Sequence, residues 1–172
     1  MPQVIEMILK MRLEKLVVNR SHTELTMCFD MPSKQDWQLW KTTIRIGESE
    51  EYSYASASNA ITGNNKGEYD LNAPERCVVL GFDAPYDGKA TVIKVTVPYL
   101  ITSVSEVITA ERVQVANEKL EADGISFEYV NRDVKVIQMP SGMPEWEVYQ
   151  LIWDALADRY DGPWTFTVPV EP

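Results

Sequence analysis

Three aspartates near the end of the chain have a spacing that could serve chemistry. Asp154, Asp158 and Asp161 lie at positions i, i+4 and i+7 of a predicted helix, which would bring their carboxylates toward one face. Such a cluster could hold a divalent cation or supply a general acid and base. The simpler interpretation is that they form the solvated edge of the helix, and we expect no metal there.

The two cysteines and the one histidine add no catalytic pattern. Cys28 and Cys77 lie inside apolar stretches, and we expect both to be free, buried thiols that behave as small hydrophobic residues. They form no C-x-x-C pair, and His22, in a predicted surface turn, completes no usual zinc site or triad. A disulfide would need oxidising surroundings, and because no export signal is evident we expect the chain in the cytoplasm.

The remaining motifs also fail to indicate an enzyme. The segment 63–67 contains two glycines and a lysine, but it lacks the spacing of a phosphate-binding loop. Asp83 and Asp87 flank a turn without the alternating ligands of a calcium loop. The sequence therefore predicts no cofactor and favours a protein without catalytic activity.

Aromatic residues supply the best binding candidates. Residues 51–72 form a long polar segment whose composition mixes tyrosines with Ser, Asn and Gly, as is typical of binding loops. We expect this segment to contact a partner, through residues that include Tyr52, Tyr54, Asn64, Asn65 and Tyr69. Trp37 and Trp40 could stack on a sugar or base, although packing beneath the first sheet explains them equally well.

The charge of the chain limits its partners. The 172 residues carry 16 Lys and Arg against 26 Asp and Glu, a net charge of -10. This balance argues against direct binding to nucleic acid or to an anionic membrane, and no apolar run is long enough for a membrane span. The acids concentrate in residues 46–75 and 137–172, which could instead mimic DNA toward a basic partner.

Alternating apolar residues predict strands in the first part of the chain. Met7, Leu9, Met11 and Leu13 alternate with Ile8, Lys10, Arg12 and Glu14. After a turn near 19–22 the alternation resumes with Leu25, Met27 and Phe29. A third strand is expected over residues 40–46. The stretch 77–82 reads as a buried strand.

The second part has a different order of elements. A strand at 90–97 precedes a helix over 106–122 with a capping box of Ser103 and Glu106, and Asp123-Gly124 would end that helix. A hairpin follows over 125–138. A second helix begins near Pro144, and a last strand contains residues 164–168. The expected core face of the second helix contains the residues Trp146, Tyr149, Trp153, Leu156 and Tyr160.

These elements predict an α+β protein with a β-rich half of hairpins, residues 1–88, followed by a ferredoxin-like βαββαβ half, residues 89–172. The two halves could share one continuous domain. In the alternative, residues 106–116 form a strand and the chain is a β-sandwich with one C-terminal helix.

For function, the lack of a recognisable active site favours an interaction or assembly protein, such as a subunit of a larger particle or an accessory factor of a phage or bacterium. Its partner would be another protein or a second copy of the chain. Two alternatives remain: an acidic nucleic-acid mimic that inhibits a DNA- or RNA-binding protein, and a small carboxylate-based enzyme or sugar-binding module.

Overall fold

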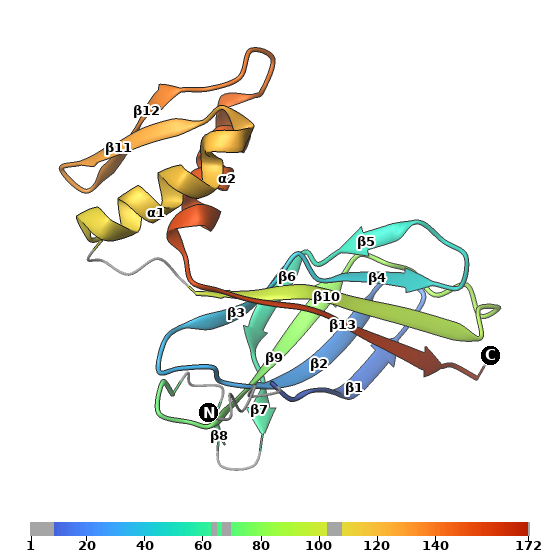
Figure 1. The fold of residues 1–172 in the computed structure, drawn as a ribbon. Coiled ribbons are helices and arrows are strands. Elements are labelled where there is room, and N and C mark those ends of the chain that lie inside the picture. Colours follow the sequence, from blue (N-terminus) through green and yellow to red (C-terminus); the bar gives the residue numbers. More distant parts are fainter. Residues whose placement is uncertain (1–8, 63–64, 67–69, 103–107, 172) are drawn as a thin grey trace, which may run out of the picture. The chain divides into compact units, whose positions relative to one another are not determined.

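The structure is a computed structural model that describes residues 9–62, 65–66, 70–102 and 108–171. The chain divides into two compact units, coloured by sequence in Figure 1. Unit 1 contains residues 1–100 and 160–172, and unit 2 contains residues 101–159. Unit 2 is thus an insertion in the sequence of unit 1. The chain passes between the units at residues 100–101 and 159–160, whereas the boundary was expected near residue 88.

Unit 1 is a sandwich of two β-sheets. One sheet has the strand order β1 (Met11–Val18), β2 (Thr23–Asp30), β9 (Glu75–Phe82) and β6 (Ser56–Asn59). The other has the order β13 (Arg159–Pro169), β10 (Val92–Thr102), β4 (Thr43–Ile46) and β5 (Glu51–Ser53), and β3 (Trp37–Trp40) also pairs with β10. A small hairpin joins β7 (Ile61–Thr62) to β8 (Asn65–Lys66).

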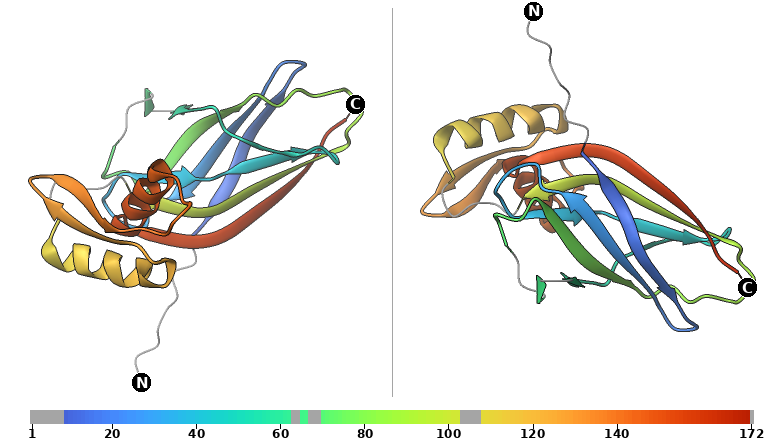
Figure 2. Two further views of the ribbon diagram at one scale, coloured as in Figure 1. Left: turned by 90° about the horizontal axis from the view of Figure 1, so that it is seen from above. Right: turned by 90° about the horizontal axis from the view of Figure 1, so that it is seen from below.

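The core of the sandwich follows from alternation along its strands. Leu25, Met27 and Phe29 of β2 point inward from one sheet and are fully buried. From the other sheet, Ile93 and Val95 of β10 meet them in the same apolar cluster. Two further views keep β1, β2 and β9 in one layer and β10 and β13 in the other (Figure 2). Because side chains alternate between faces along a strand, one inward series per strand suffices to build this core.

The first hairpin is confirmed and the third strand is corrected. β1 and β2 pair from Met11↔Phe29 to Val18↔Thr23, and His22 is exposed in the turn between them. Met7 lies outside the described residues. The strand expected over 40–46 is two strands, β3 and β4, because Lys41 adopts a left-handed conformation with φ of 50°. A non-glycine residue in that conformation interrupts regular pairing.

Unit 2 contains two helices and a hairpin around a core of its own. Helix α1 (Ala110–Leu120) is followed by the one-turn helix η1 (Glu121–Asp123), strands β11 (Ser126–Val130) and β12 (Asp133–Gln138), and helix α2 (Glu145–Leu156). The side chain of Thr109 caps α1 by accepting a hydrogen bond of 3.2 Å from the Arg112 N–H. The expected capping residues Ser103 and Glu106 lie outside the described residues. Gly124, with φ of 70°, ends the helical segment as predicted.

The buried face of α2 differs from the predicted one. Val148, Ile152 and Leu156 are buried, whereas Trp146 is 68% exposed and Trp153 is 36% exposed. The aliphatic series and the aromatic series both repeat at helical spacing, so α2 has two candidate stripes. The core of unit 2 contains the aliphatic stripe, Val148, Ile152 and Leu156.

The chain is an α+β protein with antiparallel sheets, but the ferredoxin-like arrangement is not confirmed. The order of elements from β10 to β13 is strand, helix, strand, strand, helix, strand, as expected. However, β10 and β13 are neighbours in the sandwich, whereas β11 and β12 form a separate two-stranded sheet. The alternative that turned residues 106–116 into a strand is wrong, because α1 covers most of them. No helix in the described part of the chain is long and apolar enough to cross a membrane.

Candidate functional site

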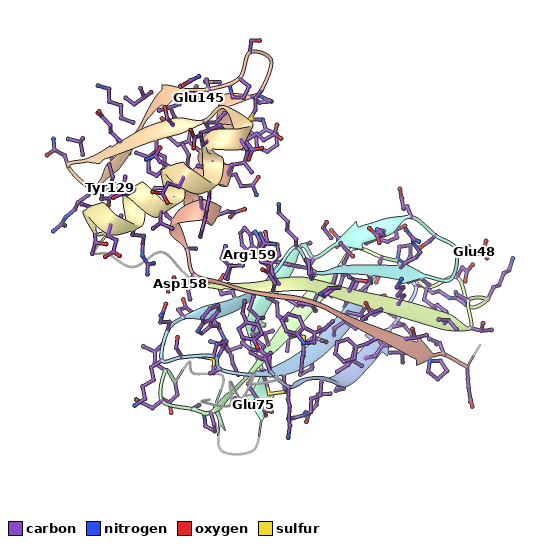
Figure 3. The ribbon with its side chains drawn as sticks, viewed as in Figure 1. Glu48, Glu75, Tyr129, Glu145, Asp158 and Arg159 are labelled. Carbon is purple, nitrogen blue, oxygen red and sulfur yellow. A yellow bond between two sulfur atoms is a disulfide. The ribbon has the colours of Figure 1, made fainter. Side chains whose placement is uncertain are left out.

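A groove runs along the free edge of β12 in unit 2. β11 pairs with one side of β12, and within the described residues no strand pairs with its other side. The groove has a volume of about 580 Å³ and is lined by β12 together with Glu145 and Tyr149 of α2. Glu145 lies at the start of α2 (Figure 3). The unpaired side of a strand offers backbone N–H and C=O groups to another chain.

Apolar side chains gather along this groove. Val130 is 49% exposed, Ile137 is 54% exposed and Met139 is 41% exposed. Val134 and Val136 of β12 point toward the unit's core, so Ile137 follows on the outer side, where alternation would place a polar residue. Exposed apolar residues that line one groove are typical of a contact surface rather than of a solvated strand.

The charges around the groove are mostly negative. Asp133 and Glu145 line it together with one base, Lys135. In residues 101–159 as a whole, eleven side chains are acidic and five are basic. The groove therefore combines apolar contact area with an acidic surrounding, which favours a partner that carries basic residues.

A second candidate is a disulfide on the outer face of the first sheet. Cys28 and Cys77 are directly opposed on β2 and β9 with Cα atoms 4.1 Å apart, and their sulfur atoms are bonded. The expectation of two free thiols is therefore wrong, although both residues are buried as predicted. The antiparallel register brought together two residues separated by 49 positions in sequence.

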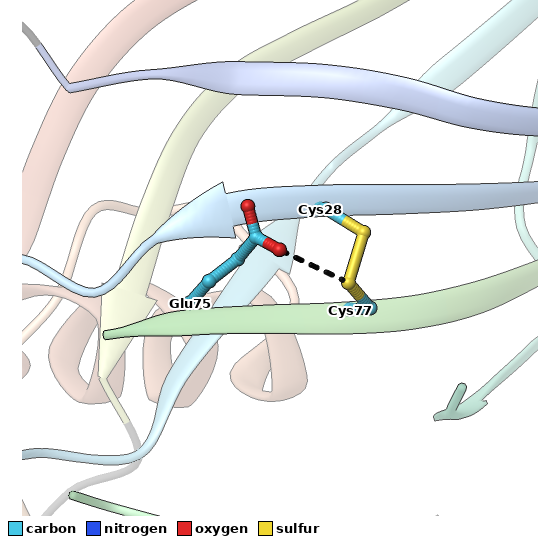
Figure 4. A group of neighbouring side chains, drawn as sticks. All are labelled: Cys28, Glu75 and Cys77. Carbon is cyan, nitrogen blue, oxygen red and sulfur yellow. Dashed lines mark hydrogen bonds between the residues drawn. A yellow bond between two sulfur atoms is a disulfide. The ribbon is translucent and has the colours of Figure 1, made fainter. Parts of the chain in front are cut away.

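Two carboxylates lie beside this disulfide. In Figure 4 the carboxylate of Glu75 points toward the sulfur of Cys77. Glu75 Oε1 is 3.7 Å from Cys77 Sγ, and Glu14 Oε2 is 3.5 Å from Cys28 Sγ. Arg12 of β1 forms ion pairs with both glutamates, at 2.8 Å between its Nη2 and Glu14 Oε2. These hydrogen bonds, first that to Glu75 and then that to Glu14, raise the pKa of the Arg12 guanidinium. The two disulfide sulfurs, two carboxylates and one guanidinium thus lie close together on this face of the sheet.

A third feature is a cavity of about 220 Å³ between the edges of the two sheets, next to Arg76. The Arg76 guanidinium forms an ion pair of 2.9 Å with Asp36 and donates to Asn59 Oδ1 at 2.9 Å and to the Trp37 carbonyl. Tyr54 also lines the cavity and donates to the Leu39 carbonyl at 3.3 Å. Because Asp36 neutralises the cation, this cavity has no strong charge with which to select a ligand.

The residues expected in a binding loop are separated by the fold. Tyr52 and Tyr54 pack partly against the core of unit 1, and burial raises the pKa of the Tyr54 hydroxyl. Asn65 belongs to β8, while Asn64 and Tyr69 lie outside the described residues. Part of the segment is therefore regular sheet rather than loop.

Trp37 and Trp40, the two candidates for ligand stacking, are buried or half-buried in unit 1. Trp37 is only 5% exposed, and its indole N–H donates to Ser33 Oγ at 3.1 Å, so it has almost no free ring surface for stacking on a ligand. Trp40 is half-buried, and its indole Nε1 is buried without a hydrogen-bond partner among the described residues.

The three aspartates do not share one helix. Asp154 lies on α2, which ends at Leu156, and Asp161 lies in β13. Asp158, labelled in Figure 3, follows the helix. It pairs with Arg112 at 3.2 Å between Oδ2 and Nη2. The expected i, i+4, i+7 alignment is therefore wrong, since the helix stops before two of its three members.

The groove at β12 and the carboxylates beside the disulfide were not recognised in the sequence. One feature of the sequence could have indicated the groove. The alternation of apolar and polar residues over 134–139 breaks at Ile137, which is apolar where a polar residue is expected. In comparisons with known proteins, no protein family, no curated protein and no solved structure matches this chain.

Proposed function

We propose that this protein is a non-catalytic interaction or assembly protein that binds an extended segment of a partner along the free edge of β12. The single observation that carries the proposal is the groove beside this edge, with Ile137 and Met139 exposed in it. An added strand would obtain main-chain hydrogen bonds from β12 and side-chain contacts from the groove, as in other cases of strand addition.

The side chains of the groove define the partner's chemistry. Alternate residues of an added strand would point toward the apolar groups Val136 and Tyr149. The residues between them would lie closer to solvent and to Asp133 and Glu145. We therefore infer a partner segment that alternates apolar residues with Lys or Arg.

A second copy of the chain fits the same edge less well. Pairing of two β12 strands would bring together two units in which acidic residues outnumber basic ones by more than two to one. Like charges that face each other across an interface oppose association. A nucleic-acid mimic would need the two acidic segments on one face. These segments belong to different units, since 46–75 lies in unit 1 and 137–159 lies in unit 2.

The test is a selection of random ten-residue peptides on the full-length protein, followed by affinity measurement with the selected peptides. We expect sequences that alternate apolar and basic residues, and slower amide exchange along β12 when they bind. Ile137→Glu should weaken binding at least about tenfold, a loss of about 1.4 kcal/mol.

Val115→Glu is the matched control, because Val115 is 42% exposed on α1 and does not line this groove. It should leave the affinity within about twofold. Selected peptides that bind Ile137→Glu as tightly as the natural protein would contradict the proposal, as would a concentration-dependent dimer that Ile137→Glu abolishes.

A further inference from the structure

The side chains beside the disulfide have the composition of a metal site. Cys28, Cys77 and Glu75 each offer a ligand atom, and these atoms all lie within 4.8 Å of one another. Glu14 brings a second carboxylate to 3.5 Å from Cys28 Sγ. The four residues come from the three neighbouring strands β1, β2 and β9.

The separation of sulfur and oxygen atoms at this place agrees with ligands of one tetrahedral zinc ion. With Zn–S of about 2.3 Å and Zn–O of about 2.0–2.2 Å, neighbouring sulfur and oxygen ligands lie about 3.5 Å apart. The observed sulfur–oxygen separations are 3.7 Å for Cys77 and Glu75, and 3.5 Å for Cys28 and Glu14. The two sulfur atoms are too close for two zinc ligands, because they are bonded to each other.

We propose that reduction of the Cys28–Cys77 disulfide creates a zinc site with Cys28, Cys77 and Glu75 as ligands, with the fourth position left to solvent. A dithiol reductant gives two electrons and two protons to the disulfide and becomes a cyclic disulfide itself, while Cys28 and Cys77 become thiols. Zinc then binds the two thiolates, and their two protons pass to solvent. The same sulfur atoms thus form either a covalent cross-link or a metal site.

Arg12 limits the negative charge of the reduced site. Two thiolates and two carboxylates carry four negative charges, which a divalent cation only halves. The Arg12 guanidinium adds one positive charge and forms ion pairs with both Glu14 and Glu75. Such a hydrogen bond to the ligating carboxylate of Glu75 orients it toward a metal.

Burial favours specific binding over surface adsorption. Cys28 is fully buried and Cys77 is 7% exposed, and Ala60 packs against both. The Ala60 N–H donates to the Cys77 carbonyl at 3.0 Å, which holds this cover in place. Thiolates in such a site select zinc or cobalt over magnesium and calcium, which prefer oxygen ligands only.

Cobalt provides the test, because a thiolate–cobalt bond gives a charge-transfer absorption that carboxylate ligands alone do not give. The full-length protein is reduced with a dithiol, the reductant is removed without oxygen, and Co²⁺ is titrated. We expect one Co²⁺ per chain with thiolate charge-transfer and tetrahedral ligand-field bands, both removed by one equivalent of Zn²⁺. The oxidised protein should show neither band.

Glu75→Gln should weaken cobalt binding by the reduced protein at least about tenfold. The control is Glu24→Gln, which lies on the same face of β2 as Cys28 by alternation and should change the affinity less than about twofold. Circular dichroism checks that both variants are folded. A reduced protein without the thiolate band, cobalt bound through carboxylates only, or equal affinities for Glu75→Gln and Glu24→Gln would overturn the proposal.

Discussion

The side chain of Asn117 joins helix to strand in unit 2. Its Nδ2 donates to the carbonyls of Val113 at 3.1 Å and Phe127 at 3.0 Å, and its Oδ1 accepts from the Phe127 N–H at 2.9 Å. Phe127 is buried in the core of this unit. One amide therefore satisfies both backbone groups of Phe127 at the point where β11 meets α1.

Asn117→Ala should destabilise unit 2 by about 2–3 kcal/mol, because it leaves two part-buried backbone groups of Phe127 without these partners. Urea unfolding followed by far-UV circular dichroism measures the loss. Gln114→Ala, which removes only an exposed contact to Glu118, is the control and should change stability by less than about 0.5 kcal/mol. Equal effects of the two substitutions would show that the bridge contributes little.

At the scale of elements, α2 has one face in the core and another in solvent. The buried face contains Val148, Ile152 and Leu156. Trp146, Gln150 and Trp153 lie at helical spacing on the opposite side. The helix is thus amphipathic in an unusual sense, since its outer face contains the larger apolar side chains.

Ile152→Ala should cost about 2–5 kcal/mol through the cavity it leaves. Trp146→Ala should change stability by less than about 0.5 kcal/mol, because the ring is mostly in solvent. Chemical denaturation of both variants gives the comparison. A larger loss for Trp146→Ala than for Ile152→Ala would reverse the assignment of the two faces.

At the scale of the molecule, the disulfide links strands that are distant in sequence. Cys28 and Cys77 are separated by 49 positions, and the cross-link closes a loop that contains β3 to β8. In the chain-entropy account, a loop of this size limits the unfolded ensemble and stabilises the folded state.

Reduction should lower the free energy of unfolding by about 4 kcal/mol in the absence of added metal. Guanidinium unfolding with and without a dithiol, both with a chelator present, measures this difference. The double variant Cys28→Ser/Cys77→Ser is the control and should not respond to the reductant. Identical unfolding curves of the oxidised and reduced natural protein would contradict the cross-link as a source of stability.

The two units have separate apolar cores, which suggests that unit 1 can fold without unit 2. Among the residues that the structure describes, the core cluster of unit 1 contains none from unit 2, and the cluster of unit 2 contains none from unit 1. The ends of the insertion meet, because the Thr102 N–H donates to the Asp158 carbonyl at 3.0 Å and the Asp158 N–H donates to Thr102 Oγ1 at 2.9 Å. A short turn between Thr102 and Asp158 could therefore replace residues 103–157.

Replacement of residues 103–157 by Asn-Gly, a pair suited to a two-residue turn, should leave unit 1 folded. We expect a cooperative thermal transition and retained near-ultraviolet circular dichroism from Trp37 and Trp164. The full-length chain is the reference for both signals. A non-cooperative melt of the shortened chain would show that unit 1 needs the insertion to fold.

Local patterns predicted many of the elements. The alternation of Leu25, Met27 and Phe29 correctly indicated a strand with one buried face, and Gly124 correctly ended the first helical segment. These signals depend on residues close in sequence, whose period or backbone preference is the same in any fold. The turn between β11 and β12 was also predicted from neighbouring residues. In it, Asn131 and Arg132 adopt the two positive φ values that a tight hairpin requires.

Only the tertiary structure decided which elements meet and which faces are buried. Pairing of β10 with β13, and of Cys28 with Cys77, joins residues far apart in the chain, and no local period encodes such a partner. The two stripes of α2 are both compatible with a helix, so the packing of α1 and the hairpin selected Ile152 over Trp153. For the same reason the groove at Ile137 and the carboxylates beside the disulfide became visible only when neighbouring strands were in place, because each site is composed of residues from several elements.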